Sequence, residues 1–161
     1  MRHHFLSKHA AVLFRRYPWI TGILYHVWRI FQQKFSVGVV GVTLDDEHHV
    51  LLVEHVFHPL HPWGLPGGWV DRNEDPQCAI EREYMEELGI KIDVGPILLM
   101  ESQNSNHLDI AYLCTSNAEK IDKLSYELLQ HRWFNWKNLP DIRDFHRRAI
   151  HNALAMQNRN G

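Results

Sequence analysis

One short segment, DPQCAIEREYMEELG at residues 75–89, restricts the fold of this chain more than any other. Asp75 is a favourable N-cap, and Pro76 suits the first helical position because its missing N–H would have no partner there. Gly89 readily adopts the left-handed conformation that ends a helix. The segment therefore predicts a helix from Pro76 to Leu88.

This helix would carry two different faces side by side. With about 100° per residue, Ile80, Tyr84 and Leu88 share one side, which we expect to pack on a sheet. Next to it lies a crowded group of three glutamates: Glu83, Glu86 and Glu87. Like charges at this spacing cost about 0.2–0.5 kcal/mol per pair. A solvated acidic face is the plain interpretation, but these acids lie at the packing boundary.

The loop before the helix suggests why the glutamates are there. The sequence GLPGGW at residues 64–69 can bring backbone carbonyl groups close to the helix. Carboxylates together with carbonyl oxygens are the ligands of hard divalent cations. A bound cation turns the repulsion into attraction, so the segment predicts a metal site.

The rest of the chain interleaves strands with helices. Strands are predicted at 36–44, 49–56, 95–102, 107–116 and 131–136, with hairpin turns at 45–48 and 103–106. The last helix is predicted to begin near Asp141. This order predicts an α/β sandwich with a mixed sheet over residues 36–161, preceded by a helical extension at 1–35.

Charge is distributed unevenly along the 161 residues. Residues 1–44 hold six Lys or Arg and no acid, whereas the remainder holds 11 basic and 19 acidic residues, a net −8. Such an acidic body does not favour nucleic acid, because binding phosphates requires Lys and Arg. The two cysteines, Cys78 and Cys114, lack the spacing of a disulfide framework, so we expect a reducing, cytoplasmic setting.

The helix and the loop before it resemble the Nudix box. Gly68 is followed after five residues by Glu74 and after seven more by REYMEELGI, residues 82–90. Every charged and glycine position of that family pattern is present, and the one departure is Tyr84 at a usually aliphatic position. WGLPGG and RWFNWKNLP are also similar to the family. The resemblance covers roughly residues 36–155.

The resemblance implies the Nudix fold, an α/β/α sandwich. It also implies hydrolysis of the diphosphate bond in a nucleoside diphosphate linked to a sugar, alcohol or phosphate, with Mg²⁺ or Mn²⁺ as cofactor. The Gly67 carbonyl would bind metal together with three side chains: Glu83, Glu86 and Glu87. Arg82 would orient the carboxylates through charge-assisted hydrogen bonds, and Glu74 would be a weaker or indirect metal contact.

Many members of the family add an acid from outside the box. Glu127 is our candidate for both metal binding and catalysis, because Arg132 and Trp133 follow it as in some relatives. The alternative is a surface glutamate before a strand. Within a tightly coupled cluster the general base cannot be assigned from the sequence, and all four glutamates qualify.

Three side chains near the box are candidates for substrate binding: Trp63, Trp69 and His58. A tryptophan could stack on a base, although core packing is the stronger interpretation for Trp63 and an equal one for Trp69. Tyr112 is expected to be a sheet residue.

His55, His58 and His61 recur every third residue, which suggests zinc. Pro59 and Pro62 prevent a regular helix that would align them, and a zinc site also needs a fourth ligand or an open position. We therefore expect loop histidines that contact substrate or solvent.

The N-terminal extension has an apolar stripe at helical spacing. Its longest uncharged stretch, Tyr17 to Trp28, is too short for a span of about 20 residues. A targeting peptide and an amphipathic helix on a membrane surface are both compatible with residues 1–34. We favour packing on protein, either on the body or in a homodimer.

The sequence thus predicts a Mg²⁺-dependent Nudix hydrolase that acts on a small nucleoside diphosphate derivative. Two alternatives stay open. One is a nucleotide-sensing Nudix module without turnover, against which the intact glutamate set argues. The other is an enzyme at a membrane surface whose diphosphate substrate carries a lipid.

Overall fold

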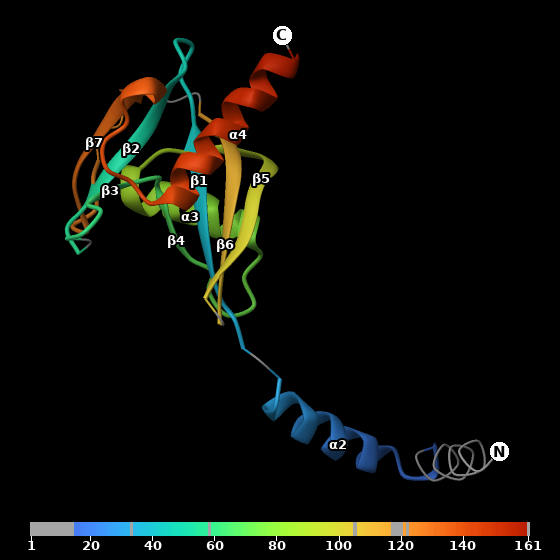
Figure 1. Ribbon diagram of the computed structural model, residues 1–161. Coiled ribbons are helices and arrows are strands. Elements are labelled where there is room, and N and C mark those ends of the chain that lie inside the picture. The colour runs from blue at the N-terminus through green and yellow to red at the C-terminus, as the bar shows by residue number, and fades with distance from the viewer. Residues whose placement is uncertain are drawn as a thin grey trace. The chain divides into compact units, whose positions relative to one another are not determined.

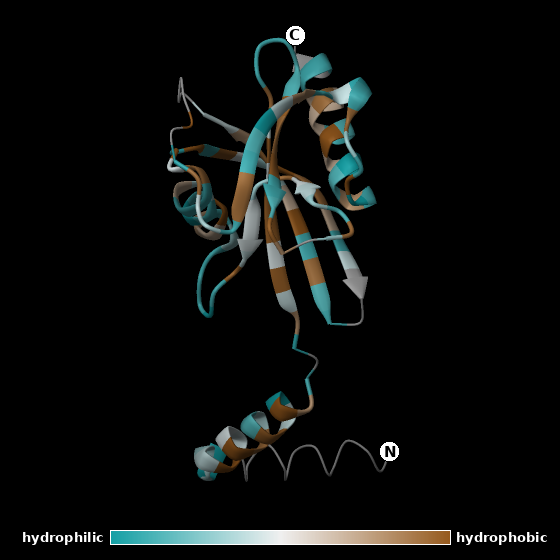
Figure 2. Ribbon diagram, turned by 90° about the vertical axis from the view of Figure 1, so that its left-hand side faces the viewer, coloured by the Kyte–Doolittle hydropathy of each residue, from teal (hydrophilic) through white to brown (hydrophobic). Residues whose placement is uncertain are grey.

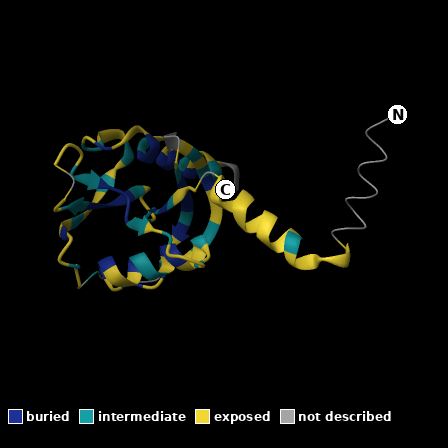
Figure 3. Cartoon of the chain, turned by 90° about the horizontal axis from the view of Figure 1, so that it is seen from below, coloured by how far each residue is buried: buried dark blue, intermediate teal, exposed yellow. Residues whose placement is uncertain are grey.

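A computed structural model describes residues 15–32, 34–57, 59–104, 106–116, 121 and 123–160, without the side chains of 103, 104, 159 and 160. The chain forms two compact units, residues 1–34 and 35–161. In the first, helix α2 (Pro18–Ile30) begins with a proline, as its fixed φ allows. The side chains of α2 are largely exposed (Figure 3). Within the described part of the chain, no helix has the length and apolarity to cross a membrane.

Seven strands and two further α-helices build the second unit (Figure 1). The strands are β1 (Ser36–Thr43), β2 (His49–His55), β3 (Trp63–Gly64), β4 (Gly67–Trp69), β5 (Asp93–Asn104), β6 (His107–Thr115) and β7 (Leu128–Asn135). The helices are α3 (Pro76–Leu88) and α4 (Asp144–Asn160), with a 3₁₀ turn at Trp136–Asn138. Strand order is β4-β1-β6-β5 in one sheet and β3-β2-β7 in the other.

The first sheet is mixed. Strand β1 runs parallel to β6 and antiparallel to β4, and β5 is antiparallel to β6. Because side chains alternate across a strand, the sheets bury one core under α3 and another under α4. In β1, Val39 belongs to the core of α3 and Val42 to that of α4. The two helices cover opposite faces (Figure 2), which confirms the predicted α/β/α sandwich.

Helix α3 has the predicted bounds. The Asp75 carboxylate accepts the Gln77 N–H at 2.9 Å, and Gly89 ends the helix with φ 68°. Ile80, Tyr84 and Leu88 are fully buried, as their shared face predicts. The capping residues therefore place the glutamate face at a defined edge of the sandwich.

Two details of the sequence-based prediction were wrong. Strands β1 and β2 do not form a hairpin ladder, because after a single bridge between Leu44 and Val50 they diverge into different sheets. Helix α4 begins at Asp144 rather than near Asp141. Asp141 lies outside the helix and accepts a hydrogen bond from the His61 ring at 3.0 Å. The predicted 95–102 and 107–116 hairpin is confirmed as β5 and β6.

Candidate active site

The glycine pair at the start of β4 brings backbone against the glutamate helix. Gly67 has φ 148° and lies so close to β1 that a Cβ would overlap the Val39 carbonyl oxygen. Its N–H donates to Glu87 Oε2 at 3.0 Å. A Cβ at Gly68 would overlap the Glu83 carboxylate. Only glycines allow this approach of loop and helix.

Arg82 links the remaining acids of the box. Its Nε and Nη2 donate to the two oxygens of Glu74 at 2.9 and 3.0 Å. Its Nη1 donates to Glu83 at 2.9 Å and to Glu86 at 3.2 Å, and Nη2 also reaches the Trp69 carbonyl at 3.0 Å. The hydrogen bonds from Arg82 lower the pKa of Glu74 to about 2. Glu74 thus fixes the guanidinium that orients two predicted metal ligands.

The three clustered glutamates differ in burial. Glu87 is only 6% exposed, and burial raises the pKa of its carboxyl to about 8, against the opposing Gly67 N–H. Burial also raises the pKa of Glu83, although Arg82 works against this rise. Glu86, by contrast, has a side chain that is 60% exposed. The helix therefore holds two carboxylates in surroundings that disfavour their negative charge.

Glu127 lies with these acids. One cavity of about 470 Å³ is lined by Glu83, Glu86 and Glu87 of α3 and by residues 123–127. The charge of Glu127 contributes to the raised pKa values of Glu83 and Glu87. The Ser125 N–H donates to the Glu87 carbonyl at 3.0 Å, which fastens this segment to the end of α3. All four glutamates thus face one space.

The donor set suits a hard divalent cation. Among the residues that the structure describes, no three metal-binding side chains converge in a ready-made metal site, and Arg82 binds both Glu83 and Glu86. Yet the cavity gathers carboxylates that are partly desolvated, and such charges are costly without a cation. These oxygens, together with the Gly67 carbonyl beside them, would hold Mg²⁺ or Mn²⁺.

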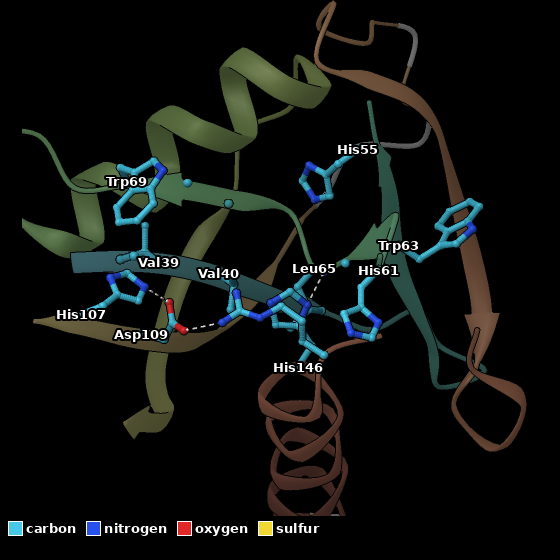
Figure 4. Close-up of a pocket in the computed structure, with 15 residues that line it drawn as sticks. Val39, Val40, His55, His61, Trp63, Leu65, Trp69, His107, Asp109 and His146 are labelled. Carbon is cyan, nitrogen blue, oxygen red and sulfur yellow. Dashed lines mark hydrogen bonds and ion pairs between the residues drawn. The ribbon is translucent and has the colours of Figure 1, made fainter. Parts of the chain in front are cut away.

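Residues of β4 also line a second pocket (Figure 4). Gly67, Gly68 and Trp69 line it, so the strand that contacts Glu83 and Glu87 also forms part of its wall. Trp69 is 62% exposed and lies 4.9 Å from His107 between ring centroids. Trp63 also lines the pocket and packs edge-on against Phe134 at 4.8 Å.

The predicted histidines divide between this pocket and the undescribed part. His55 and His61 both line the pocket, whereas His58 lies outside the described residues. No zinc-like cluster of three ligands occurs within the described ranges. The ring of His61 is held by Asp141 at 3.0 Å.

Comparison with known proteins identifies the family. The sequence profile of the NUDIX domain matches residues 33–153. The chain belongs to the Nudix hydrolase family. It is 29% identical to an NAD-capped RNA hydrolase NudC of Photorhabdus laumondii over 79% of this chain and 47% of that protein. It is 38% identical to diphosphoinositol polyphosphate phosphohydrolase 2 of Rattus norvegicus over 44% of this chain and 40% of that protein. The chain thus spans less than half the length of these curated relatives.

Solved structures agree on the fold of this Nudix chain. An ADP-ribose pyrophosphatase of Streptococcus suis superposes with a TM-score of 0.62 at 19% identity, covering 78% of this chain and 92% of that one. A MutT Nudix hydrolase of Burkholderia pseudomallei superposes with a TM-score of 0.61 at 25% identity, covering 74% of this chain and 98% of that one. The family and fold inferred from the box are confirmed.

The unusual tyrosine of this Nudix box has a structural partner. The Tyr84 hydroxyl donates to the Gly41 carbonyl at 2.9 Å and lies 2.9 Å from Thr43 Oγ1. A Cβ at Gly41 would overlap the tyrosine ring, so a glycine in β1 makes room for it. The large side chain thereby binds α3 to β1 by hydrogen bonds as well as by packing.

The sequence did not point to two charged residues of the second pocket, Asp109 and Arg143. Asp109 is 5% exposed and binds both Arg143 Nη2 at 3.0 Å and His107 Nε2 at 2.8 Å. A signal was present, since Asp109 shares the alternation of Ala111, a buried residue, on β6. An acid at an inward position of an apolar strand needs a partner. Tyr112 is a buried sheet residue, as predicted.

Proposed function

We propose that this protein hydrolyses the diphosphate bond of a small nucleoside diphosphate derivative with the help of Mg²⁺ or Mn²⁺. The observation that supports this most directly is the shared cavity of Glu83, Glu86, Glu87 and Glu127, with two of the carboxyl groups partly desolvated. When bound, the cation would neutralise diphosphate oxygens and make a coordinated water acidic.

The chain's own residues have distinct parts in this proposal. The cation would be held by the Gly67 carbonyl and by Glu83, Glu86 and Glu87, and Glu127 would complete the site from the segment before β7. Arg82, held in place by Glu74 through two hydrogen bonds, positions Glu83 and Glu86. Glu87 keeps its orientation through the Gly67 N–H. Ligands fixed in this way would keep the cation in place to neutralise negative charge on the diphosphate oxygens, with little reorganisation.

The remainder of the substrate would enter the second pocket. Trp69 offers an exposed ring for stacking, while Trp63 forms a packed wall against Phe134. His58 is proposed as a further contact from the loop between β2 and β3. Gly67 and Gly68 line this pocket and lie against Glu87 and Glu83 of the acidic cavity, which supports a substrate that reaches from one space to the other.

The relatives support the reaction more than the substrate. They include an NAD-capped RNA hydrolase, a diphosphoinositol polyphosphate phosphohydrolase and an ADP-ribose pyrophosphatase. We propose a small molecule rather than RNA, because residues 45–161 carry a net −8. Both described cysteines, Cys78 and Cys114, are free, which fits the reducing cytoplasm that we propose as its location.

A substrate panel tests the proposal. Purified protein is incubated with nucleotide sugars, ADP-ribose, CDP-alcohols, nucleoside triphosphates and an NAD-capped RNA, with Mg²⁺ or Mn²⁺ and with chelator. Metal-dependent release of nucleoside monophosphate or phosphate from a small substrate is expected. Binding of nucleotides without any release would favour the sensing module. Release confined to a lipid-linked diphosphate would favour the membrane-surface enzyme.

A further inference from the structure

The titratable side chains that line the second pocket are mostly bases, whereas those of the proposed catalytic cavity are mostly acids. Four histidines and one arginine line it: His55, His61, His107, His146 and Arg143. Asp109 is the one acid among the described lining residues, and it is bound to Arg143 and His107. The neighbouring catalytic cavity contains four glutamates and a single lysine. Two adjoining spaces of this Nudix protein therefore have opposite character.

Arg143 is held in place for recognition. Its Nη2 donates to the buried Asp109 carboxylate at 3.0 Å, and within the described part of the chain this is the hydrogen-bond partner of its guanidinium. The side chain nevertheless stays 44% exposed, whereas that of Asp109 is 7% exposed. A buried acid thus anchors one edge of the guanidinium, while the side chain lines the pocket and remains partly exposed. A planar, oriented guanidinium suits phosphate and carboxylate groups.

Asp109 connects this arginine to the proposed stacking residue. The His107 ring donates from Nε2 to Asp109 Oδ1, 2.8 Å away, and lies against Trp69 (Figure 4). His107 also contacts the Ser36 hydroxyl at 3.0 Å, which fixes the ring. A continuous row, Trp69, His107, Asp109 and Arg143, therefore follows one wall of the pocket. The row offers an aromatic surface at one end and a cation at the other, so it suits a ligand that has both a planar part and an anionic part.

We propose that this pocket binds an anionic group, a phosphate or a carboxylate, on the part of the substrate beyond the diphosphate, and that Arg143 is the residue that selects it. The inference rests on the proposed diphosphatase function. It narrows the substrate class to nucleoside diphosphate derivatives with an additional negative charge. Arg143 would be a specificity residue, and Asp109 would be its positioning residue.

The experiment uses substrate pairs that differ by one anionic group: UDP-glucuronate against UDP-glucose, and NADP⁺ against NAD⁺. The variants are Arg143→Met and Arg143→Lys, with Arg148→Met as the matched control, since Arg148 pairs with Asp144 and Glu101 outside the pocket. Turnover is measured with Mg²⁺, and binding is measured by calorimetry in chelator. The binding arm separates failure of this inference from failure of the hydrolase proposal.

For the wild-type protein we expect the anionic member of at least one pair to bind about tenfold or more tightly, the scale of a charge-assisted contact. Arg143→Met should abolish that preference without weakening the neutral partner, Arg143→Lys should keep part of it, and Arg148→Met should keep all of it. An unchanged preference in Arg143→Met, or no preference in the wild type, overturns the inference. If Arg143→Met does not fold, the double variant Asp109→Asn, Arg143→Met also removes the buried carboxylate that would lack a partner. It is judged by the same ratio of affinities for the anionic and the neutral substrate.

Discussion

The Gly67 N–H donates to Glu87 Oε2 at 3.0 Å and holds a carboxylate that is otherwise buried. This contact joins the glycine loop to the acidic helix and places a metal-ligand candidate at the floor of the cavity. Because one N–H offsets only part of the desolvation, the pKa of Glu87 stays raised, at about 8. A cation is the natural remaining partner of this carboxylate.

Replacing Glu86 or Glu87 by Gln keeps the size of the side chain and removes its charge. We expect metal-dependent turnover to fall by about a hundredfold or more in each variant, the scale of losing a main electrostatic contributor. Glu81→Gln is the matched control, since Glu81 is an exposed glutamate of the same helix. Steady-state rates on the best substrate of the panel decide the matter, and near-normal rates in both variants would contradict the assignment.

The raised pKa of Glu87 makes stability depend on pH when metal is absent. Between the unfolded value of 4.5 and about 8, the folded protein holds a proton that the unfolded chain has released. The free energy of unfolding therefore falls as pH rises through this window, by up to a few kcal/mol. Thermal melts in chelator from pH 5 to 8.5 should show the decline, and Glu87→Gln should flatten it. An equal slope in both proteins would show that Glu87 titrates normally.

Glu127 is predicted to act on the metal from outside the box. Glu127→Gln should lower turnover and raise the Mg²⁺ concentration needed for half-maximal rate, while the melting temperature stays close to that of the wild type. The physical reason is the loss of one negative charge from the cavity that it shares with Glu83 and Glu87. A metal titration identical to that of the wild type would return Glu127 to the role of a surface residue.

The hydroxyl of Tyr84 should contribute to stability. Tyr84→Phe removes the donor to the Gly41 carbonyl and leaves Thr43 Oγ1, in a residue that is 3% exposed, without this partner. We expect a loss of about 1–3 kcal/mol in the free energy of unfolding by denaturant. Tyr112→Phe provides the comparison, as a second buried tyrosine of the same core. Equal stability of the Tyr84→Phe variant and the wild type would count against a role for the hydroxyl.

The apolar stripe of α2 needs a cover, because each large side chain left in water forgoes about 1.5–3 kcal/mol. Trp19, Ile23 and Trp28 are all more than half exposed. We expect protein to be that cover, so the full chain should be dimeric by light scattering and should not pellet with anionic vesicles. Ile23→Glu should disrupt the dimer or cause aggregation, whereas Tyr25→Glu, about 200° around the helix, should do so less.

Sedimentation with anionic vesicles distinguishes whether lipid or protein covers the apolar stripe of α2. Lipid binding would combine insertion of the stripe with attraction of headgroups to Arg15, Arg16, Arg29 and Lys34. It would weaken in salt, since exposed charges are screened over about 8 Å at physiological ionic strength. Salt-sensitive pelleting with anionic vesicles would show that a membrane, and not protein, covers this helix.

Local sequence determined much of this protein. Asp75, Pro76 and Gly89 sufficed to bound α3, because capping depends on backbone groups within one turn. The spacing of glycines, acids and Arg82 identified the family, since that chemistry lies within 23 consecutive residues. The alternation of apolar residues likewise predicted β5, β6 and the sandwich.

Only the tertiary structure decided what depends on contacts between distant segments. Burial separates Glu87 from Glu86, although the two are neighbours in sequence, because the β4 loop covers one and leaves the other in solvent. The row Trp69, His107, Asp109 and Arg143 joins β4, β6 and the start of α4, and no local pattern predicts such a meeting. Strands β1 and β2 separate into two sheets for the same reason: pairing is chosen by the whole core, whereas a turn sequence acts only on its neighbours.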